Sequence, residues 1–457
     1  MRRLMCSHFR WRRNGFQGWR WWWWRQVGGG DAAGTDNALV YNGNIVRQVA
    51  GNFGTPKRPR AGLKVFLLGL FDENEKGEPE YERHFGIFRA DGAEAYDLIF
   101  GKYREEAWQC FLLCLSRICQ ETASTKQFRC LFSSVLAVAA QIGICYGQVA
   151  NNLPPPSIAV KILKDNKIPN VRLFNTEPTT LASFSGSGIN LTIGVRNEDL
   201  HDLASGNTGT SLRWLQSNIF QHVPPEQVQY IAVGNEVFLK DPYYTPYVVP
   251  AILNLFQALG VLGLSGNIKL SSPLAASVLL DTYPPSSARF DPDLLSYVKP
   301  LLQFLHDTGS PFMVNVYPYI SYTNNAKFIS LDYALFRGGS ALRDGDLTYT
   351  NLFDASIDAF SFAMEKEGFP GLEMVVAETG WPTGGGDAAG TYNALVYNGN
   401  LVRRVVDNVG TPKRPGTGLK VFLFGLFDED EKDGPEYERH FGIFRADGAK
   451  AYDLIFW

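Results

Sequence analysis

The segment QYIAVGNEV (229–237) carries an apolar run that ends directly at Asn235 and Glu236. A second run of the same kind, LEMVVAETGWP (372–382), leads into Glu378. Short apolar runs rich in Val, Ile and Leu are typical of strands that are buried on both faces of a parallel sheet. The two segments therefore predict two buried strands, each with a carboxylate at its C-terminal end.

Six further runs of this kind lie between residues 143 and 457, with helical or loop stretches between them. We predict strands near 143–147, 170–174, 190–195, 229–234, 267–272, 312–317, 372–377 and 419–425. We predict helices over 156–165, 209–220, 247–259, 292–307, 351–367 and 392–409. Eight strands alternating with helices predict an α/β fold, a (β/α)8 TIM barrel over 143–457. The alternative is an open doubly wound sheet, but no G-x-G-x-x-G follows the first strand and the sequence has no P-loop.

In such a barrel the chemistry lies at the C-terminal ends of the strands. Glu236 and Glu378 would follow strands four and seven, so their side chains could converge across the mouth of the barrel. Two facing carboxylates are the machinery of glycoside hydrolysis, in which one donates a proton to the leaving oxygen and the other attacks the anomeric carbon. The alternative is that each acid caps a strand-to-loop turn, although a carboxylate beside an apolar run is costly without a partner or a task.

Composition excludes several classes of protein. The chain has 457 residues, of which 45% are hydrophobic and 19% charged, which is typical of a globular protein and not of a disordered or fibrous one. Its net charge of −3 gives no basic field, so we expect no nucleic-acid partner. The six His show no metal-ligand spacing, and we expect neither a metal nor a cofactor. No Cys follows Cys145, so a disulfide framework is excluded for the main body.

The first 142 residues differ from the rest, beginning with a leader over 1–27. This leader has seven Arg, no acidic residue and six of the ten Trp. Because no helical period organises the Trp, we expect 1–27 to be disordered. The alternatives are a segment at a membrane interface or one that stacks on nucleic acid.

An internal repeat follows the leader. Residues 28–100 align without a gap to 384–456, with 60 of 73 positions identical. The first copy is therefore a partial duplicate of the C-terminal segment of the barrel. A lone fragment of this kind leaves its apolar face unburied, so we expect the extension to be poorly ordered or loosely folded against the body. A swap in which 28–100 replaces 384–456 is the alternative, and the shorter connection of the local copy disfavours it.

Residues 101–142 form a predicted linker that contains the start of an apolar stretch, Leu131–Ile144. Its length, the preceding basic residues and its small residues resemble a secretory signal, although it lies inside the chain. A buried strand is the alternative reading. A further alternative is that the whole chain is the product of a fused gene model.

Nine motifs now appear in order along 143–457. They are GICYGQVANNLPPP (143–156), VRLFN (171–175), YIAVGNEV (230–237), VNVYPY (314–319), SLDYALF (330–336), NLFDASIDA (351–359), VVAETGWPTGGGDAA (375–389), GTPKRPG (410–416) and ERHFGIF (438–444). Together they resemble family 17 of the glycoside hydrolases, the plant endo-β-1,3-glucanases. Each motif alone is modestly specific, whereas nine in order are very specific.

The resemblance implies a (β/α)8 barrel that hydrolyses 1,3-β-D-glucans with retention of configuration. It implies that Glu236 is the proton donor and Glu378 the nucleophile, with their carboxyl groups about 5–5.5 Å apart. Supporting roles are implied for Glu429, Lys432 and Glu438. The alternative for these three residues is a solvated charged loop, because DEDEKD is a charge run.

The resemblance also implies a set of substrate-binding residues. Asn235 would bind the sugar 2-OH, and aromatic rings would stack on sugar faces. The implied set is Asn235, Tyr146, Phe174, Asn315, Tyr317, Trp381 and Phe427. Phe174 departs from the Tyr found in many family members. We expect a β-1,3-glucan as partner, a monomer, and secretion to the cell wall or vacuole as for the family. The alternative function is a non-catalytic β-glucan-binding barrel.

Overall fold

The computed structural model describes residue 42, residues 54–55 and 58–59, and then 142–338 and 341–456. The chain divides into two compact units, Met1–Thr125 and Lys126–Trp457. The leader predicted over 1–27, most of the duplicate over 28–100, and the linker over 101–142 apart from its last residue lie outside the described residues. The predicted disorder of the extension and its signal-like stretch lie largely there too.

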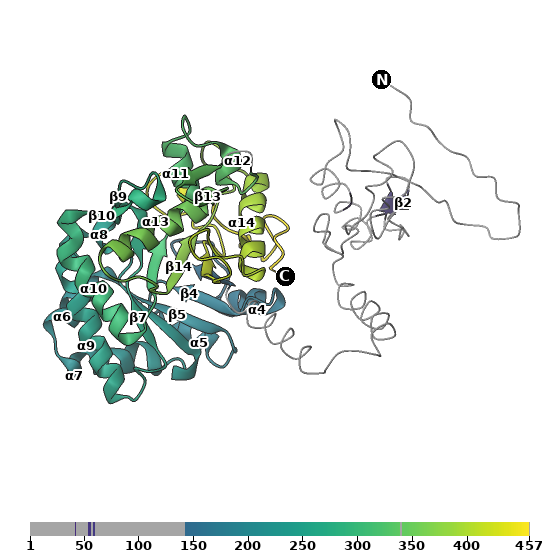
Figure 1. Ribbon diagram of the computed structural model, residues 1–457. Helices are drawn as coiled ribbons and strands as arrows, with labels where there is room; N and C mark the ends of the chain where they lie inside the picture. Colours follow the sequence, from purple (N-terminus) through teal and green to yellow (C-terminus); the bar gives the residue numbers. More distant parts are fainter. Residues whose placement is uncertain (1–41, 43–53, 56–57, 60–141, 339–340, 457) are drawn as a thin grey trace, which may run out of the picture. The chain divides into compact units, whose positions relative to one another are not determined.

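A parallel sheet forms the centre of the second unit (Figure 1). Its strands run in the order β7-β6-β5-β4-β3-β15-β14-β11-β8. They are β3 (Ile142–Tyr146), β4 (Asn170–Leu173), β5 (Asn190–Val195), β6 (Val228–Val233), β7 (Lys269–Ser271), β8 (Leu274–Ala275), β11 (Phe312–Asn315), β14 (Met374–Thr379) and β15 (Lys420–Leu423). Every ladder in this sheet is parallel.

The two ends of this sheet are consecutive pieces of one chain segment. Only Ser272 and Pro273 separate β7 from β8, yet β7 pairs with β6 and β8 pairs with β11. The sheet therefore closes on itself, and β7 with β8 fills the fifth of eight strand positions. The predicted (β/α)8 barrel is confirmed, and each predicted strand overlaps an observed one.

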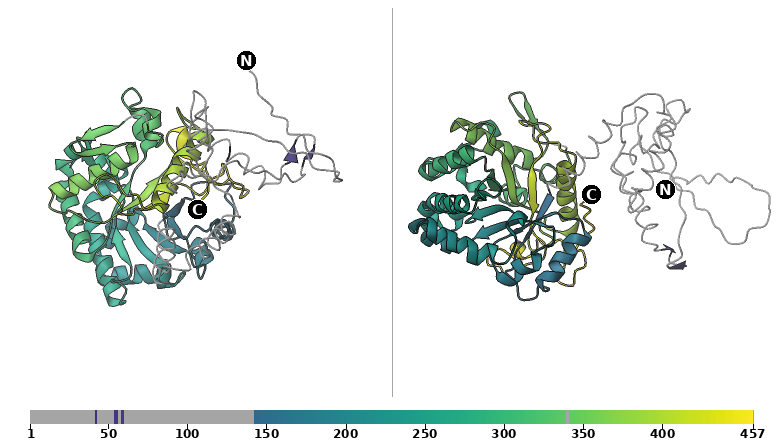
Figure 2. Two further views of the ribbon diagram at one scale, coloured as in Figure 1. Left: turned by 45° about the vertical axis from the view of Figure 1, so that its right-hand side comes forward. Right: turned by 90° about the horizontal axis from the view of Figure 1, so that it is seen from below.

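Helices surround the barrel, as the second view in Figure 2 shows from below. The longer ones are α4 (Pro156–Asp165), α7 (Thr208–Leu215), α9 (Val248–Val261), α10 (Leu295–Thr308), α13 (Leu352–Lys366) and α14 (Thr391–Val406). All six coincide with predicted helices. Shorter ones were not predicted, namely α5 (Pro178–Phe184), α6 (Leu200–Ser205), α8 (Val237–Lys240), α11 (Pro318–Asn324) and α12 (Leu331–Ala334). Two hairpins, β9–β10 (Leu279–Leu280 and Arg289–Phe290) and β12–β13 (Leu342–Asp344 and Leu347–Tyr349), lie outside the barrel sheet.

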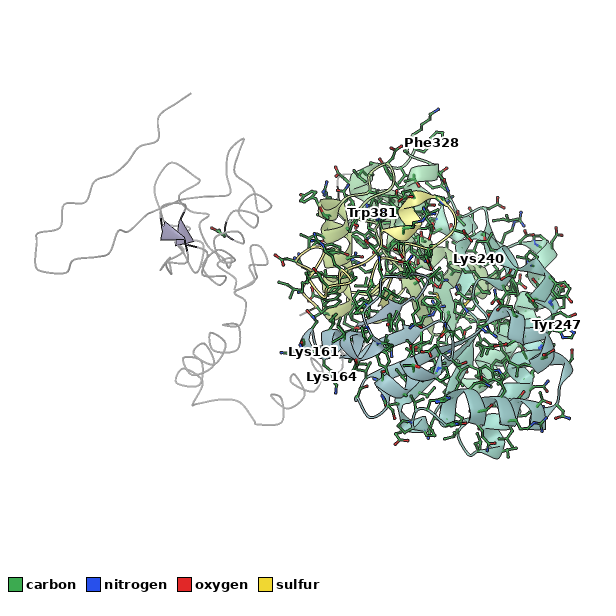
Figure 3. The ribbon with its side chains drawn as sticks, turned by 180° about the vertical axis from the view of Figure 1, so that it is seen from behind. Lys161, Lys164, Lys240, Tyr247, Phe328 and Trp381 are labelled. Atoms are coloured by element: carbon green, nitrogen blue, oxygen red, sulfur yellow. The ribbon has the colours of Figure 1, made fainter. Side chains whose placement is uncertain are left out.

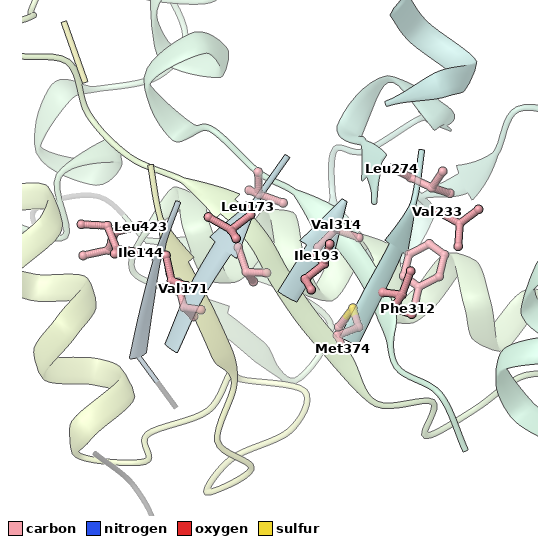
Figure 4. Close-up of a cluster of buried hydrophobic side chains, with 14 of the residues drawn as sticks. Ile144, Val171, Leu173, Ile193, Val233, Leu274, Phe312, Val314, Met374 and Leu423 are labelled. Atoms are coloured by element: carbon pink, nitrogen blue, oxygen red, sulfur yellow. The ribbon is translucent and has the colours of Figure 1, made fainter. Parts of the chain in front are cut away.

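Strand alternation divides the core into two layers. On β3, Ile142 and Ile144 belong to the large apolar cluster shared with the helices, whereas Cys145 belongs to a smaller cluster inside the barrel. Figure 4 shows the outer layer, with side chains such as Val171 and Ile193 on neighbouring strands. Alternate residues of β3 thus face opposite layers, as the period of two in a strand requires. Within the described residues no helix combines the length and apolar character that a membrane span needs.

Two of the sequence motifs meet at a buried polar contact that we call the α13 junction, made of Asp354, Asp358, Arg404, Thr411 and Lys413. Asp358 accepts hydrogen bonds from the Thr411 hydroxyl at 2.5 Å and from the Lys413 backbone N–H at 2.8 Å. Arg404 Nη2 lies 2.5 Å from Asp354 Oδ2. The motifs NLFDASIDA and GTPKRPG therefore hold α13 against the loop that leads into β15.

The repeat is visible in a small part of the first copy. Gly54 pairs with Pro59 across the two-residue strands β1 (Gly54–Thr55) and β2 (Arg58–Pro59). The equivalent residues of the second copy, Gly410 and Pro415, form an isolated bridge of the same antiparallel kind. Both copies of this turn thus have the same pairing.

Candidate active site

Glu378 points into the barrel because of an irregularity in β14. Ala377 belongs to the interior cluster, so strict alternation would turn Glu378 towards the helices. The β14 register shifts against both neighbouring strands at this point. The Thr379 hydroxyl then contacts Tyr397 of α14, on the helix side. A β-bulge of this kind re-aims a side chain, and here it places consecutive residues 377 and 378 inside.

The Glu378 carboxylate is buried between two donors. Arg172 Nη1, on β4, lies 2.8 Å from Glu378 Oε1, and the Tyr317 hydroxyl donates to Oε2 at 2.8 Å. Arg172 is itself fully buried, so this is a charge-assisted pair inside the barrel. Burial works to raise the pKa of Glu378. The positive charges of Arg172 and Lys240 and the Tyr317 hydrogen bond outweigh it, so the pKa lies below its usual value and the carboxyl is ionised.

Glu236 lies in a tight turn directly after β6. Gly234 and Glu236 both have positive φ, at 73° and 50°. A Cβ on residue 234 would lie 2.6 Å from Val237, so this position requires glycine. The Glu236 N–H donates to the Pro273 carbonyl at 2.9 Å. A non-glycine residue in this conformation is strained and is held by its surroundings, a feature often found at active sites.

Asn197 holds the peptide of Asn235, the residue before the acid. The Asn235 N–H donates to Asn197 Oδ1 at 2.8 Å, and Asn197 Nδ2 donates back to the Asn235 carbonyl at 3.2 Å. Asn197 follows β5, so a neighbouring strand end fixes the turn that carries Glu236. Sequence reasoning missed this positioning residue.

Both carboxylates belong to one hydrogen-bonded network. Arg172 Nη2 donates to Asn235 Oδ1 at 2.8 Å, while Nη1 of the same guanidinium holds Glu378. Asn315 Nδ2 donates to Asn235 Oδ1 at 3.2 Å and to Glu236 Oε1 at 3.0 Å. Residues on or after β6, β4, β11 and β14 thus join the two acids at one end of the barrel, although the acids are 142 positions apart in the chain.

Lys240 of α8 makes a second contact to Glu236. Its Nζ lies 2.7 Å from Glu236 Oε2, in an i,i+4 pair. The Lys240 side chain is 60% exposed, whereas that of Glu236 is 9% exposed. Lys240 is labelled in Figure 3, which shows the molecule from behind.

The three predicted supporting residues lie on the loop after β15. Glu429 is buried and accepts the Val149 N–H at 3.0 Å, and a Cβ at Gly147 would lie about 2.2 Å from its carboxylate. Lys432 Nζ lies 3.3 Å from Glu429 Oε2 and 4.0 Å from Glu438 Oε2. The alternative of a solvated charged loop is therefore wrong for Glu429.

Glu438 and Lys432 also act on the catalytic acids. Burial raises the pKa of Glu438, and the charges of Glu378 and Glu236 raise it further against the opposing effect of Lys432 and Lys240. The Lys432 ammonium lies 3.9 Å from the centre of the Phe424 ring. The structure thus places Lys432 and Glu438 within electrostatic reach of the site.

The aromatic residues predicted to bind substrate separate into two groups. Phe174 and Tyr317 are partly exposed and pack on the interior cluster. Trp381, Tyr146 and Phe427 are buried in the core, which leaves no ring face for a sugar. The Trp381 indole N–H donates to the Ala388 carbonyl, so the buried ring is satisfied inside the protein. For these three residues the predicted sugar stacking is corrected to core packing.

Of the predicted polar contacts, Asn235 is partly exposed and Asn315 is buried. Both belong to the network that holds the acids. Sequence reasoning missed Arg172, although an Arg inside the apolar run VRLF is itself a signal of a buried charge with a partner. It also missed Lys240. Among the described residues, no group of His, Cys, Asp and Glu has the arrangement of a metal site.

Comparisons with known proteins agree with this geometry. The family model described as Glycosyl hydrolases family 17 matches residues 142–456 and also 23–100, which includes the first copy of the repeat. A glucan endo-1,3-beta-glucosidase of Vitis vinifera is 40% identical over 329 residues, 71% of this chain and 94% of the relative. A basic isoform of the same enzyme from Phaseolus vulgaris is 40% identical over 319 residues, 69% of this chain and 90% of the relative.

Solved structures agree as well. CJP38, a beta-1,3-glucanase and pollen allergen of Cryptomeria japonica, superposes with a TM-score of 0.67 and 42% identity, covering 69% of this chain and 99% of that chain. A plant beta-glucan endohydrolase superposes with a TM-score of 0.64 and 36% identity, covering 69% of this chain and 100% of that chain. The match of the family model over most of the sequence shows that this chain belongs to family 17 of the glycosyl hydrolases.

Proposed function

We propose that this chain is an endo-hydrolase of 1,3-β-D-glucans that works by double displacement with retention of configuration. One observation supports the mechanism above all others. Glu236 and Glu378, from strand positions four and seven, share one hydrogen-bonded network through Arg172, Asn235 and Asn315. Two buried carboxylates at the C-terminal ends of barrel strands are the equipment of a glycosidase.

In the first step Glu378 is the nucleophile. Its ionised carboxylate attacks the anomeric carbon, the bond from that carbon to the glycosidic oxygen breaks, and the leaving oxygen takes a proton from Glu236. Arg172 and Tyr317 keep Glu378 ionised and fix the direction of its oxygens. The product of this step is a glycosyl ester on Glu378.

In the second step Glu236 is the base. A water molecule loses a proton to Glu236 and attacks the anomeric carbon, and the ester bond to Glu378 breaks. Two displacements at one carbon return the original configuration. Asn315 holds Oε1 of Glu236 throughout and orients the carboxyl group.

The surrounding residues have supporting roles in this proposal. Lys432, paired with Glu429, supplies positive charge near the acids, and Glu438 lies on its other side. Asn235 is placed to bind the sugar 2-OH, with the Phe174 and Tyr317 rings on the same interior cluster. We propose a monomeric enzyme that is secreted to the cell wall or vacuole and needs no metal.

We also propose that residues 28–100 are a partial duplicate without a site of its own. The match of the family model to 23–100 supports its origin in the same family. It carries Glu73, Lys76 and Glu82, which match Glu429, Lys432 and Glu438, but it has no counterpart of Glu236 and has Trp22 where the second copy has Glu378.

The test is hydrolysis of laminarin by the full chain. Reducing ends should appear together with oligosaccharides of intermediate size, and NMR of the first products should show the β-anomer before mutarotation. A protein that binds laminarin but releases no reducing ends would be the non-catalytic barrel instead. First products in the α-anomeric form would contradict double displacement.

A further inference from the structure

The position of the catalytic proton on Glu236 follows from the contacts of its two carboxyl oxygens. Oε1 accepts from Asn315 Nδ2 at 3.0 Å, and an amide nitrogen can only donate. Oε1 is therefore held as an acceptor. The proton that a general acid delivers must then reside on Oε2.

Lys240 contacts that oxygen. Its ammonium lies 2.7 Å from Oε2, and an ammonium also can only donate. Lys240 and a proton on Oε2 therefore compete for one place, and so do Lys240 and the leaving oxygen of a bound glucan. The side chain is 60% exposed on a flexible four-carbon stem, so it can move away into solvent.

We propose that Lys240 is a positioning residue that covers Oε2 of Glu236 in the empty site, leaves it when the glucan's leaving group arrives, and returns as Glu236 gives up its proton. This inference rests on the proposed role of Glu236 as the acid and base. The contact with Lys240 favours the ionised carboxylate of Glu236. The second step needs this ionised form, whereas the first step needs the protonated form. Lys240 thus sets the balance between the two protonation states that one turnover requires.

The other positive charges near the site, Arg172 and Lys432, do not take the place of Lys240 at Glu236. Arg172 contacts Glu378 and not Glu236, and Lys432 pairs with Glu429. Burial works to lower the pKa of Lys240, and the negative charges of Glu236, Glu378 and Glu438 outweigh it, so the pKa is raised and the ammonium stays charged. The groups that face Glu236 or act on it are Lys240 of α8, Asn315 of β11, Tyr317 after β11, Glu378 of β14 and Glu438 of the turn Glu436–Arg439.

The experiment compares pH profiles of kcat/KM on laminarin for the full chain and three variants. Loss of the cation in Lys240→Gln should move the alkaline limb to higher pH, because no cation then competes with a proton on Oε2. The acid limb should also move to higher pH, because the positive charge of Lys240 lowers the pKa of Glu378, although Arg172 still contacts Glu378 directly. Lys240→Arg keeps the charge and should keep the wild-type limb.

The matched control is Lys161→Gln. Lys161 forms an i,i+4 pair with Asp165 at 2.7 Å on α4 and its side chain is 70% exposed, so it makes a lysine–carboxylate pair at the same spacing and distance away from the acids (Figure 3). Its profile should equal that of the wild type. Thermal unfolding of each variant shows that the folded state is retained.

Three outcomes would overturn the inference. The alkaline limb of Lys240→Gln could stay in place, KM alone could rise, or Lys161→Gln could shift equally. In each case a wild type that hydrolyses laminarin with a two-limbed profile leaves the proposed function standing. A wild type that does not hydrolyse laminarin overturns the proposed function, and this inference with it.

Discussion

Two regions of the barrel hold pairs of buried acids. A comparison of the two regions distinguishes acids that act in catalysis from acids that hold elements of the fold together. At the barrel mouth Glu236 and Glu378 come from different strand ends and face one interior. At the α13 junction Asp354 and Asp358 come from one helix, four residues apart, and contact Arg404 of α14 and the loop at Thr411 respectively. All four acids are buried, so burial alone does not mark a catalytic residue.

The electrostatics of the two regions differ in direction. The pKa of Glu378 lies below its usual value, because Arg172 and the other donors outweigh burial. Burial raises the pKa of Asp354 to about 6, although Arg404 opposes it. The barrel mouth therefore stabilises a reactive anion next to a second acid, whereas the α13 junction uses its acids to fasten backbone and side-chain donors. Variants at the mouth should lose activity in the folded molecule, whereas variants at the junction should lose stability and keep their activity per folded molecule.

The largest expected effect is that of Glu378→Gln. The amide is nearly the same size but cannot form the glycosyl ester, so kcat on laminarin should fall roughly 10⁴-fold or more. Laminarin binding should stay close to wild type, whereas the unfolding temperature should fall, because Arg172 is left buried without its charged partner. Both are measured on the same preparation, by calorimetric titration and thermal unfolding. Residual activity near that of the wild type would remove Glu378 from the mechanism.

Glu236→Gln should reduce kcat/KM on laminarin roughly 10²–10⁴-fold, the contribution of a general acid and base. An aryl β-laminaribioside with a good leaving group needs no proton donor, so its first step should be nearly unaffected. Azide should then restore turnover and yield a β-glycosyl azide. The matched control is Glu438→Gln, which removes a neighbouring carboxylate. If azide rescued Glu438→Gln and not Glu236→Gln, the two residues would exchange roles.

Tyr317→Phe should have a smaller effect, about a 10-fold loss of kcat, because one hydrogen bond to the Glu378 carboxylate disappears. That bond lowers the pKa of Glu378, and catalysis needs the ionised form. Activity is lost as the pH falls through this pKa, so the acid limb should move to higher pH in the variant. Tyr243→Phe, at an exposed ring, is the control and should leave the limb in place. An unchanged acid limb in Tyr317→Phe would contradict the assignment of this limb to Glu378.

Arg404→Gln should have the smallest effect on activity. It breaks the pair with Asp354 and should lower the free energy of unfolding by about 2–3 kcal/mol, less than the roughly 3–5 kcal/mol of a fully buried pair because Arg404 is partly exposed. Gln is the residue that the first copy of the repeat has at the equivalent position 48. Activity per folded molecule should equal that of the wild type, measured by denaturant unfolding beside the laminarin assay. Loss of activity without loss of stability would end the contrast between the two regions.

The framework of the molecule could be predicted from its sequence because buried strands in a parallel barrel are apolar throughout. Each predicted strand and each predicted long helix was found, and both acids lie where strand ends were expected. The inward direction of the Glu378 side chain could not be predicted from the sequence, because a strict period of two places residue 378 on the same side of the strand as residue 376. Only the register shift in β14 turns Glu378 inwards.

The errors in the predicted site have a common cause. Trp381, Tyr146 and Phe427 follow strands as binding residues do, but the sequence does not show which rings are covered by neighbouring elements. Trp381 is enclosed by Tyr319, Tyr322 and Tyr397, whose elements are far apart in the chain. Arg172 and Lys240 were missed for the opposite reason, since their partners are set by the closure of the barrel and by a short helix that was not predicted.

The most direct test of the mechanism is to trap the glycosyl ester. A 2-deoxy-2-fluoro-β-laminaribiosyl fluoride slows the second step more than it slows the first, so the enzyme should accumulate with one laminaribiosyl group attached. Peptide mass spectrometry should then locate the adduct on Glu378 in wild type and find none in Glu378→Gln. An adduct on Glu236 or Glu438, or an enzyme that turns over laminarin and never carries the label, would contradict the proposed nucleophile.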